Sequence, residues 1–180
     1  MRAQVGGHSV AGMNGIDVLT EGFGRLDDLV RTAVSGLGEA QLAERIGPQA
    51  NTVAWLVWHL AREQDAQIAE LSGTDEVWVA DGWADRFALP LDRADNGYGN
   101  SPQQVAAVRA PAELLVGYAQ AATAASIGYV SGLTDDQLDD VIDPGWDPPV
   151  TRGVRLVSVL DDAIQHAGQA AFVRGVLLSA

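Results

Sequence analysis

Three side chains in two distant segments have the types and spacing of metal ligands. His59 lies in an apolar stretch of residues 52–63, and Asp162 and His166 lie far downstream. Residues four positions apart project from the same face of a helix, so Asp162 and His166 can bind one ion together. An imidazole from a facing helix would be a third ligand. Three protein ligands leave a position open for water or substrate, which is typical of catalytic metal sites.

Each half of this pattern also has an ordinary structural explanation. A single histidine in an apolar helix is more often a hydrogen-bonded core residue, and an aspartate–histidine pair on a helix is often a simple side-chain contact. Asp161, the alternative carboxylate, points away from the face of His166, and we interpret it as solvated. The combination favours a metal site, because helical bundles assemble such sites from inward-facing side chains.

Residues that share these helix faces are candidates for substrate binding. Trp55 lies four residues before His59 and is predicted to form core or a pocket wall. Gln169 lies three residues after His166, where it could reach the rim of the site or remain a surface amide. Arg174 lies about two turns beyond His166, where it could meet a substrate carboxylate. No side chain is assigned a catalytic role from the sequence.

The composition excludes several classes of function. The chain has 180 residues, a formal net charge of −13 and 47% hydrophobic residues, which predicts a folded domain with a sizeable core. Such an acidic chain would be repelled by nucleic acid and by anionic membrane surfaces. No apolar run approaches the roughly 18 residues of a spanning helix, and the N-terminus lacks a secretory signal pattern. We therefore expect a cytoplasmic protein.

Apolar residues recur at helical spacing in four segments. We predict main helices near residues 16–35, 52–72, 102–130 and 153–178, with little strand signal, and hence an all-α four-helix bundle. Residues 1–15 are Gly-rich and are expected to be flexible, which leaves residues 16–180 as a single domain. Pro111 should kink or divide the third helix.

The links between these helices predict their arrangement. The link between the first two helices reads as a loop with one helical turn near residues 39–44, so these helices are expected to be antiparallel neighbours. Residues 74–100 are the least regular part of the chain. A connection of this length permits a long crossover between the second and third helices. The glycines at 97 and 99 indicate no more than a flexible loop.

Residues 52–60 and 162–170 resemble the DinB-like superfamily of metal-binding four-helix bundles. Within it, the chain resembles the branch of mycothiol-dependent transferases and maleylpyruvate isomerase-type proteins, over residues 15–174. The resemblance implies a divalent metal held by His59, Asp162 and His166, zinc first and nickel or another divalent ion as alternatives. The transferase branch commonly has glutamate at the position of Asp162. Isomerase-type members carry a further C-terminal domain, so maleylpyruvate isomerisation is not expected.

The resemblance implies a metal-dependent S-transferase that joins a low-molecular-weight, mycothiol-type thiol to a small electrophile. The chain contains no cysteine, which fits a nucleophile that arrives with the cosubstrate. The electrophile would lie between Trp55, the crossover and the end of the last helix. Two alternatives remain open, namely a non-catalytic or stress-associated metal-binding protein and a metal-dependent hydrolase with a metal-bound water. A homodimer is allowed but not specified.

Overall fold

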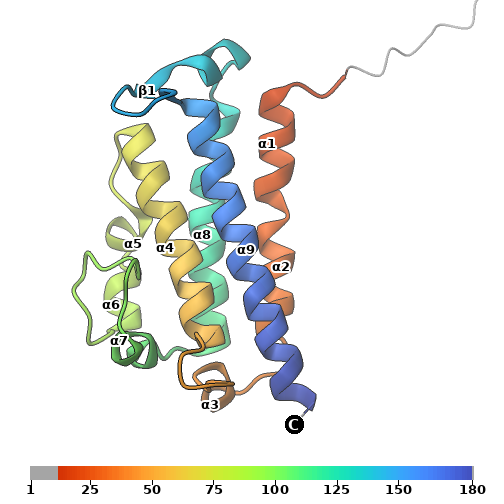
Figure 1. Ribbon diagram of the computed structural model, residues 1–180, viewed down its shortest axis with the longest axis vertical. Helices are drawn as coiled ribbons and strands as arrows, with labels where there is room; N and C mark the ends of the chain where they lie inside the picture. The colour runs from red at the N-terminus through yellow and green to blue at the C-terminus, as the bar shows by residue number, and fades with distance from the viewer. Residues whose placement is uncertain (1–11, 180) are drawn as a thin grey trace, which may run out of the picture.

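Four helical columns run along a common axis in the computed structural model, which describes residues 12–179 (Figure 1). The first column consists of two helices that meet at Arg25, and each of the other three is one long helix. These elements are α1 (Gly15–Gly24) with α2 (Leu26–Val34), α4 (Val53–Ser72), α8 (Ala112–Ser131) and α9 (Arg152–Ser179). The prediction of an all-α four-helix bundle is confirmed.

The order of the columns around the bundle differs from the prediction. Helix α4 packs against α8 and α9, while α1 packs on α8 and α2 on α9. The first column therefore lies diagonally across from α4, as Figure 1 shows. The prediction that these two are neighbours is wrong, because the link between them is not a tight loop. It includes α3 (Glu39–Leu42) and crosses the end of the bundle.

The predicted crossover between α4 and α8 is confirmed. The chain leaves the end of α4 and returns along its outer side through α5 (Val77–Ala80), α6 (Trp83–Phe87) and α7 (Pro102–Ala107) (Figure 1). Helices α4 and α8 are consequently parallel. The chain also divides before Pro111 as predicted, because proline lacks an N–H and disfavours helix at the residue before it.

A short hairpin connects α8 to α9. A 3-10 helix at Asp135–Asp139 leads into β1 (Val141–Asp143), which pairs antiparallel with β2 (Val150–Thr151). Among residues 12–179 only five are in strands, too few to produce a recognisable alternation in the sequence. Of the predicted flexible segment 1–15, residues 1–11 lie outside the described residues, and Asn14 caps α1 through the backbone N–H of Asp17.

Helix α4 is the central element that positions the site. Thr52 caps it by accepting a hydrogen bond from the Trp55 N–H, and every residue from 53 to 62 is buried. A helix that is apolar on all sides must be covered on all sides, and here α8, α9 and the crossover cover it. His59 is buried for this reason. Among residues 12–179, no helix is long and apolar enough to cross a membrane.

Candidate metal centre

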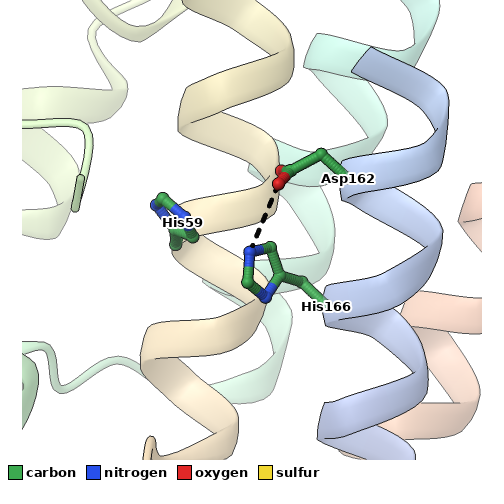
Figure 2. Close-up of side chains that lie close together, drawn as sticks. All are labelled: His59, Asp162 and His166. Atoms are coloured by element: carbon green, nitrogen blue, oxygen red, sulfur yellow. Dashed lines mark ion pairs between the residues drawn. The ribbon is translucent and has the colours of Figure 1, made fainter. Parts of the chain in front are cut away.

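The three predicted ligands converge at the contact between α4 and α9. His59 projects from α4, and Asp162 and His166 project toward it from one face of α9 (Figure 2). Each offers one ligand atom, and these atoms lie within 4.8 Å of one another. The two imidazole centroids are 4.8 Å apart. The helical spacing that motivated the prediction therefore produces a cluster of two imidazoles and one carboxylate.

His59 is held from both sides. Its Nδ1 lies 2.6 Å from the carbonyl oxygen of Asn96, and its ring stacks on Trp55 at a centroid distance of 4.5 Å. The Trp55 Nε1–H in turn donates to Asn100 at 3.0 Å. With Nδ1–H donating to the crossover, Nε2 keeps a free lone pair. A backbone carbonyl that fixes the tautomer in this way is a common feature of metal-binding histidines.

Close approach of the crossover to His59 depends on Gly97. This glycine has φ +97°, and a Cβ built on it would lie 2.5 Å from Nδ1 of His59. No L side chain fits there without moving the loop. The sequence indicated no more than a flexible loop at the glycines 97 and 99, and the contact of Gly97 with His59 is a role that it did not predict.

His166 is oriented in the same manner as His59. Its Nδ1 lies 3.2 Å from Oε1 of Gln169, and its Nε2 lies 3.5 Å from Oδ1 of Asp162 (Figure 2). A separation of 3.5 Å is long for a hydrogen bond. It is close to the roughly 3.3 Å between two ligands of a tetrahedral zinc ion with bonds of about 2.0–2.1 Å. The spacing of this pair is compatible with an ion between the two groups.

Asp162 has one oxygen that no donor among residues 12–179 satisfies. Its Oδ2 is buried, and among the described residues it has no hydrogen-bond partner. A buried carboxylate oxygen without a donor is costly, and such atoms call for a missing cation or water. This orphaned oxygen, together with two imidazoles whose Nδ1 atoms are already engaged, is a donor set that fits a divalent ion.

Electrostatics within the cluster keep the ligands in usable forms. Burial lowers the pKa of His59, so its neutral, metal-binding form is favoured at neutral pH. The adjacent Asp162 raises the pKa of His166, and His166 lowers the pKa of Asp162. Protons therefore compete with a cation chiefly at His166. Metal binding would displace that proton.

Glu63 is a further acidic group near the cluster that the sequence reasoning missed. It follows His59 by one turn of α4 and is only partly exposed. Its Oε2 accepts a hydrogen bond from Gln67 at 3.4 Å, whereas its buried Oε1 has no partner within residues 12–179. Burial and the charge of Asp162 raise the pKa of Glu63. The i, i+4 spacing from His59 was the signal that could have identified it.

The three predicted substrate-binding residues have different surroundings. Trp55 is 6% exposed and contacts both imidazoles, with a centroid distance of 6.2 Å to His166. Gln169 contacts His166 directly. Arg174 is not brought to the cluster, because its Nε donates to the carbonyl oxygen of Ser35 at 2.5 Å. That contact joins α9 to the end of α2.

Comparison with known proteins shows the family to which the chain belongs. A family model described as mycothiol-S-transferase matches residues 19–178. The chain belongs to the mycothiol-S-transferase family. A crystal structure of a conserved protein from Enterococcus faecalis is similar at 35% identity with a TM-score of 0.87, and the match covers 94% of this chain and 100% of that one. Comparison with curated proteins gives no significant match. The DinB-like bundle fold expected from the sequence is confirmed.

Proposed function

We propose that the protein is a metal-dependent S-transferase that joins a mycothiol-type thiol to a small electrophile. The observation that carries the proposal is the cluster of His59, Asp162 and His166 in a member of the mycothiol-S-transferase family. Nδ1 of each imidazole lies beside an oxygen acceptor, and Nε2 of His166 faces Asp162. The Asp162 carboxylate also has a buried oxygen without a partner in the described chain.

These three residues would hold one divalent ion, with zinc as the first expectation and nickel as the alternative. Two nitrogens and one carboxylate oxygen leave a coordination position open. When bound, the ion lowers the pKa of a coordinating thiol, so that the thiolate is available at neutral pH. The chain has no cysteine, and the attacking sulfur must therefore come from the cosubstrate.

The remaining residues orient the ligands and handle the proton. Asn96 and Gln169 hold the imidazoles in the tautomers that present Nε2. Trp55 stacks on His59 and keeps that side of the cluster dry. Glu63 Oε1 is the acceptor for the thiol proton, because its carboxylate is partly buried and burial raises its pKa above the usual value. The S–H bond breaks and the proton passes to Glu63. Sulfur then bonds to the electrophilic carbon as the π bond of that carbon, or its bond to a leaving group, breaks. Glu63 returns the proton to the neighbouring carbon or to the leaving group.

A cobalt-substituted protein tests whether a thiol enters the site. Addition of a mycothiol-type thiol should change the visible spectrum, because sulfur would join the two imidazoles and the carboxylate around the ion. Turnover should need both metal and thiol, and a chelator should abolish it. An unchanged cobalt spectrum at saturating thiol would count against transfer. Consumption of the electrophile without thiol would favour metal-dependent hydrolysis instead.

Two substitutions on α9 test the ligand assignment separately from activity. His166→Ala should reduce zinc affinity by more than about 100-fold, because even loss of a supporting residue costs about 10–100-fold. Gln169→Ala should cost about tenfold at most, since Gln169 only orients His166. Isothermal titration with zinc measures both. Equal zinc affinity in wild type and His166→Ala would remove His166 from the ligand set.

A further inference from the structure

A cavity lies beside the cluster of His59, Asp162 and His166, toward the C-terminal end of α9. It has a volume of about 390 Å³, within the range of small-molecule sites. Its lining comes from the start of α4 and from one stretch of α9, namely Asn51, Leu56, Gly168, Gln169, Phe172 and Val173. None of these six side chains carries a charge, although the whole chain has a net charge of −13. A neutral, largely apolar recess in so acidic a protein selects an uncharged apolar group.

The cavity adjoins the cluster at Gln169. This residue lines the cavity and also contacts Nδ1 of His166 at 3.2 Å. Leu56, on the opposite wall, follows Trp55, whose ring stacks on His59. From His166 to Phe172 the rise along α9 is about 9 Å. A small molecule in the cavity would therefore place one end beside the imidazoles and the other against Phe172.

The cavity has a buried base and an exposed rim. Leu56 and Val173 are 1% and 5% exposed, so they form a packed base, whereas Phe172 is 67% exposed at the rim. An exposed aromatic ring next to buried aliphatic side chains is a suitable contact for a planar or aromatic group. Gly168 adds space, because within the described part of the chain no atom lies within 4 Å of where its Cβ would stand.

We propose that this cavity binds the apolar, uncharged portion of the electrophile, so that the enzyme prefers aryl or bulky alkyl acceptors over small polar ones. This inference rests on the proposed transferase function, because only a transferase would use the bound molecule as an acceptor. Binding of the apolar group to the cavity requires neither thiol nor metal. For an activated alkene acceptor, the thiol S–H bond breaks, sulfur bonds to one alkene carbon, and the thiol proton ends on the other. No leaving group or further reactant is required.

Filling the cavity is the direct test. Gly168→Leu introduces a side chain at a position with free space and replaces a poor helix former, so the variant should fold. Gly128→Leu on α8 is the matched control, because that glycine is also exposed and, among residues 12–179, has no atom within 4 Å of its Cβ position. The control lies outside the cavity lining.

The probes are N-phenylsuccinimide and succinimide, which are unreactive analogues of maleimide acceptors, with binding followed by ligand-observed NMR on the full chain. Wild type and Gly128→Leu should bind N-phenylsuccinimide at least tenfold more tightly than succinimide. Gly168→Leu should lose at least tenfold in that binding while zinc affinity stays within twofold of wild type. In turnover, KM for N-phenylmaleimide should rise at least tenfold in Gly168→Leu, with little change for N-ethylmaleimide.

Three outcomes separate the hypotheses. Unchanged N-phenylsuccinimide binding in Gly168→Leu overturns the cavity assignment. A concentration-dependent dimer that Gly168→Leu dissociates would also overturn it, because the face would then be an interface between two copies. Loss of probe binding in Gly168→Leu without thiol-dependent turnover in wild type would support the cavity and refute the transferase. The failure of one proposal is thus distinguishable from the failure of the other.

Discussion

Two carboxylates, the buried Asp65 and the half-buried Asp162, show how differently the two sides of α4 are built. Asp65 faces the crossover and accepts hydrogen bonds from the N–H groups of Val77 and Trp78 at 2.9 and 2.8 Å, and from the Tyr118 hydroxyl at 2.9 Å. Asp162 faces α4 from α9, and within residues 12–179 its Oδ2 has no donor. Both are acidic groups in the same bundle, yet of the two only Asp65 has donors for both of its oxygens within the described part of the chain.

The side of α4 that faces the crossover is a structural network. Arg62 is fully buried, contacts Glu76 at 2.5 Å and donates through Nε to the carbonyl oxygen of Asp95 at 3.2 Å. Burial raises the pKa of Tyr118 well above its usual range, so its hydroxyl stays protonated and donates to Asp65. These contacts fasten the crossover to α4 and so carry Asn96 and Gly97 to His59.

The number of unpaired acceptors distinguishes a structural polar cluster from a candidate binding site. In the network around Arg62 and Asp65, acceptors and donors are mostly matched within the chain, and what remains is stability. In the cluster around Asp162 the acceptors exceed the donors, and both Asp162 and Glu63 have an oxygen without a partner in the described structure. An excess of acceptors beside imidazole nitrogens is an arrangement that a cation would complete.

The largest expected effect comes from removing the satisfied carboxylate. Asp65→Ala should lower the free energy of unfolding by about 3–5 kcal/mol, because it leaves three donors without their acceptor and removes the carboxylate that lies 3.9 Å from the buried Arg62 guanidinium. Asp162→Ala should change the stability of the metal-free protein by about 1 kcal/mol or less, since its side chain is 40% exposed. Chemical denaturation of metal-free protein measures both.

The effects of these two substitutions on zinc affinity should have the opposite order. Asp162→Ala should lose most of the zinc affinity, whereas Asp65→Ala, where it remains folded, should keep it. Equal loss of stability in the two metal-free variants would show that Asp162 is as important to the fold as Asp65, which would contradict the distinction between a structural network and a metal site.

The second prediction concerns the glycine that lets the crossover reach His59. Gly97→Ala should weaken zinc binding by about tenfold, because its Cβ would lie 2.5 Å from Nδ1 of His59 and displace the Asn96 carbonyl. Gly99→Ala is the matched control, with φ +71° and, among the described residues, no atom within 4 Å of its Cβ position. Both should lose about 1 kcal/mol of stability from the left-handed backbone. Zinc titration should distinguish them, and equal affinities would exclude the support role of Gly97.

The bundle and the three clustered residues were predictable because they depend on local periodicity. Helical spacing located α4, α8 and α9, and the i, i+4 rule placed Asp162 and His166 on one face. The order of the columns was not predictable in the same way. It depends on how residues 35–52 cross the end of the bundle, which is a property of packing and not of pattern.

The supporting residues of the site were the part that sequence reasoning missed. Asn96 contacts His59 through its backbone carbonyl, so its side chain carries no signal of that role. The function of Gly97 depends on a contact across 38 positions of sequence that only the fold creates. Arg174 shares an approximate helix face with His166, but over two turns the face drifts, and its guanidinium reaches α2 instead.

The smallest expected effect is the pH dependence associated with Glu63. Burial, and then the charge of Asp162, raise the pKa of this carboxyl above its usual value of 4.5. The folded state therefore holds the Glu63 proton more tightly than the unfolded state does. This contribution to stability is fully present below pH 4.5 and is lost as the pH rises through the pKa of the folded state. At neutral pH the ionised Glu63 opposes folding of the metal-free protein.

Glu63→Gln removes the partly buried negative charge that opposes folding at neutral pH. The metal-free variant should be more stable than wild type at pH 7, by up to about 1 kcal/mol, and the difference should shrink as the pH falls toward 4. Bound zinc should shrink it as well, because a cation near Asp162 offsets the repulsion between the two carboxylates. Glu70→Gln, an exposed glutamate further along α4, is the control and should shift stability by less than about 0.5 kcal/mol. A Glu63→Gln variant less stable than wild type at pH 7 would mean that the carboxylate is already satisfied without a metal, and the contrast with Asp65 would fail at this residue.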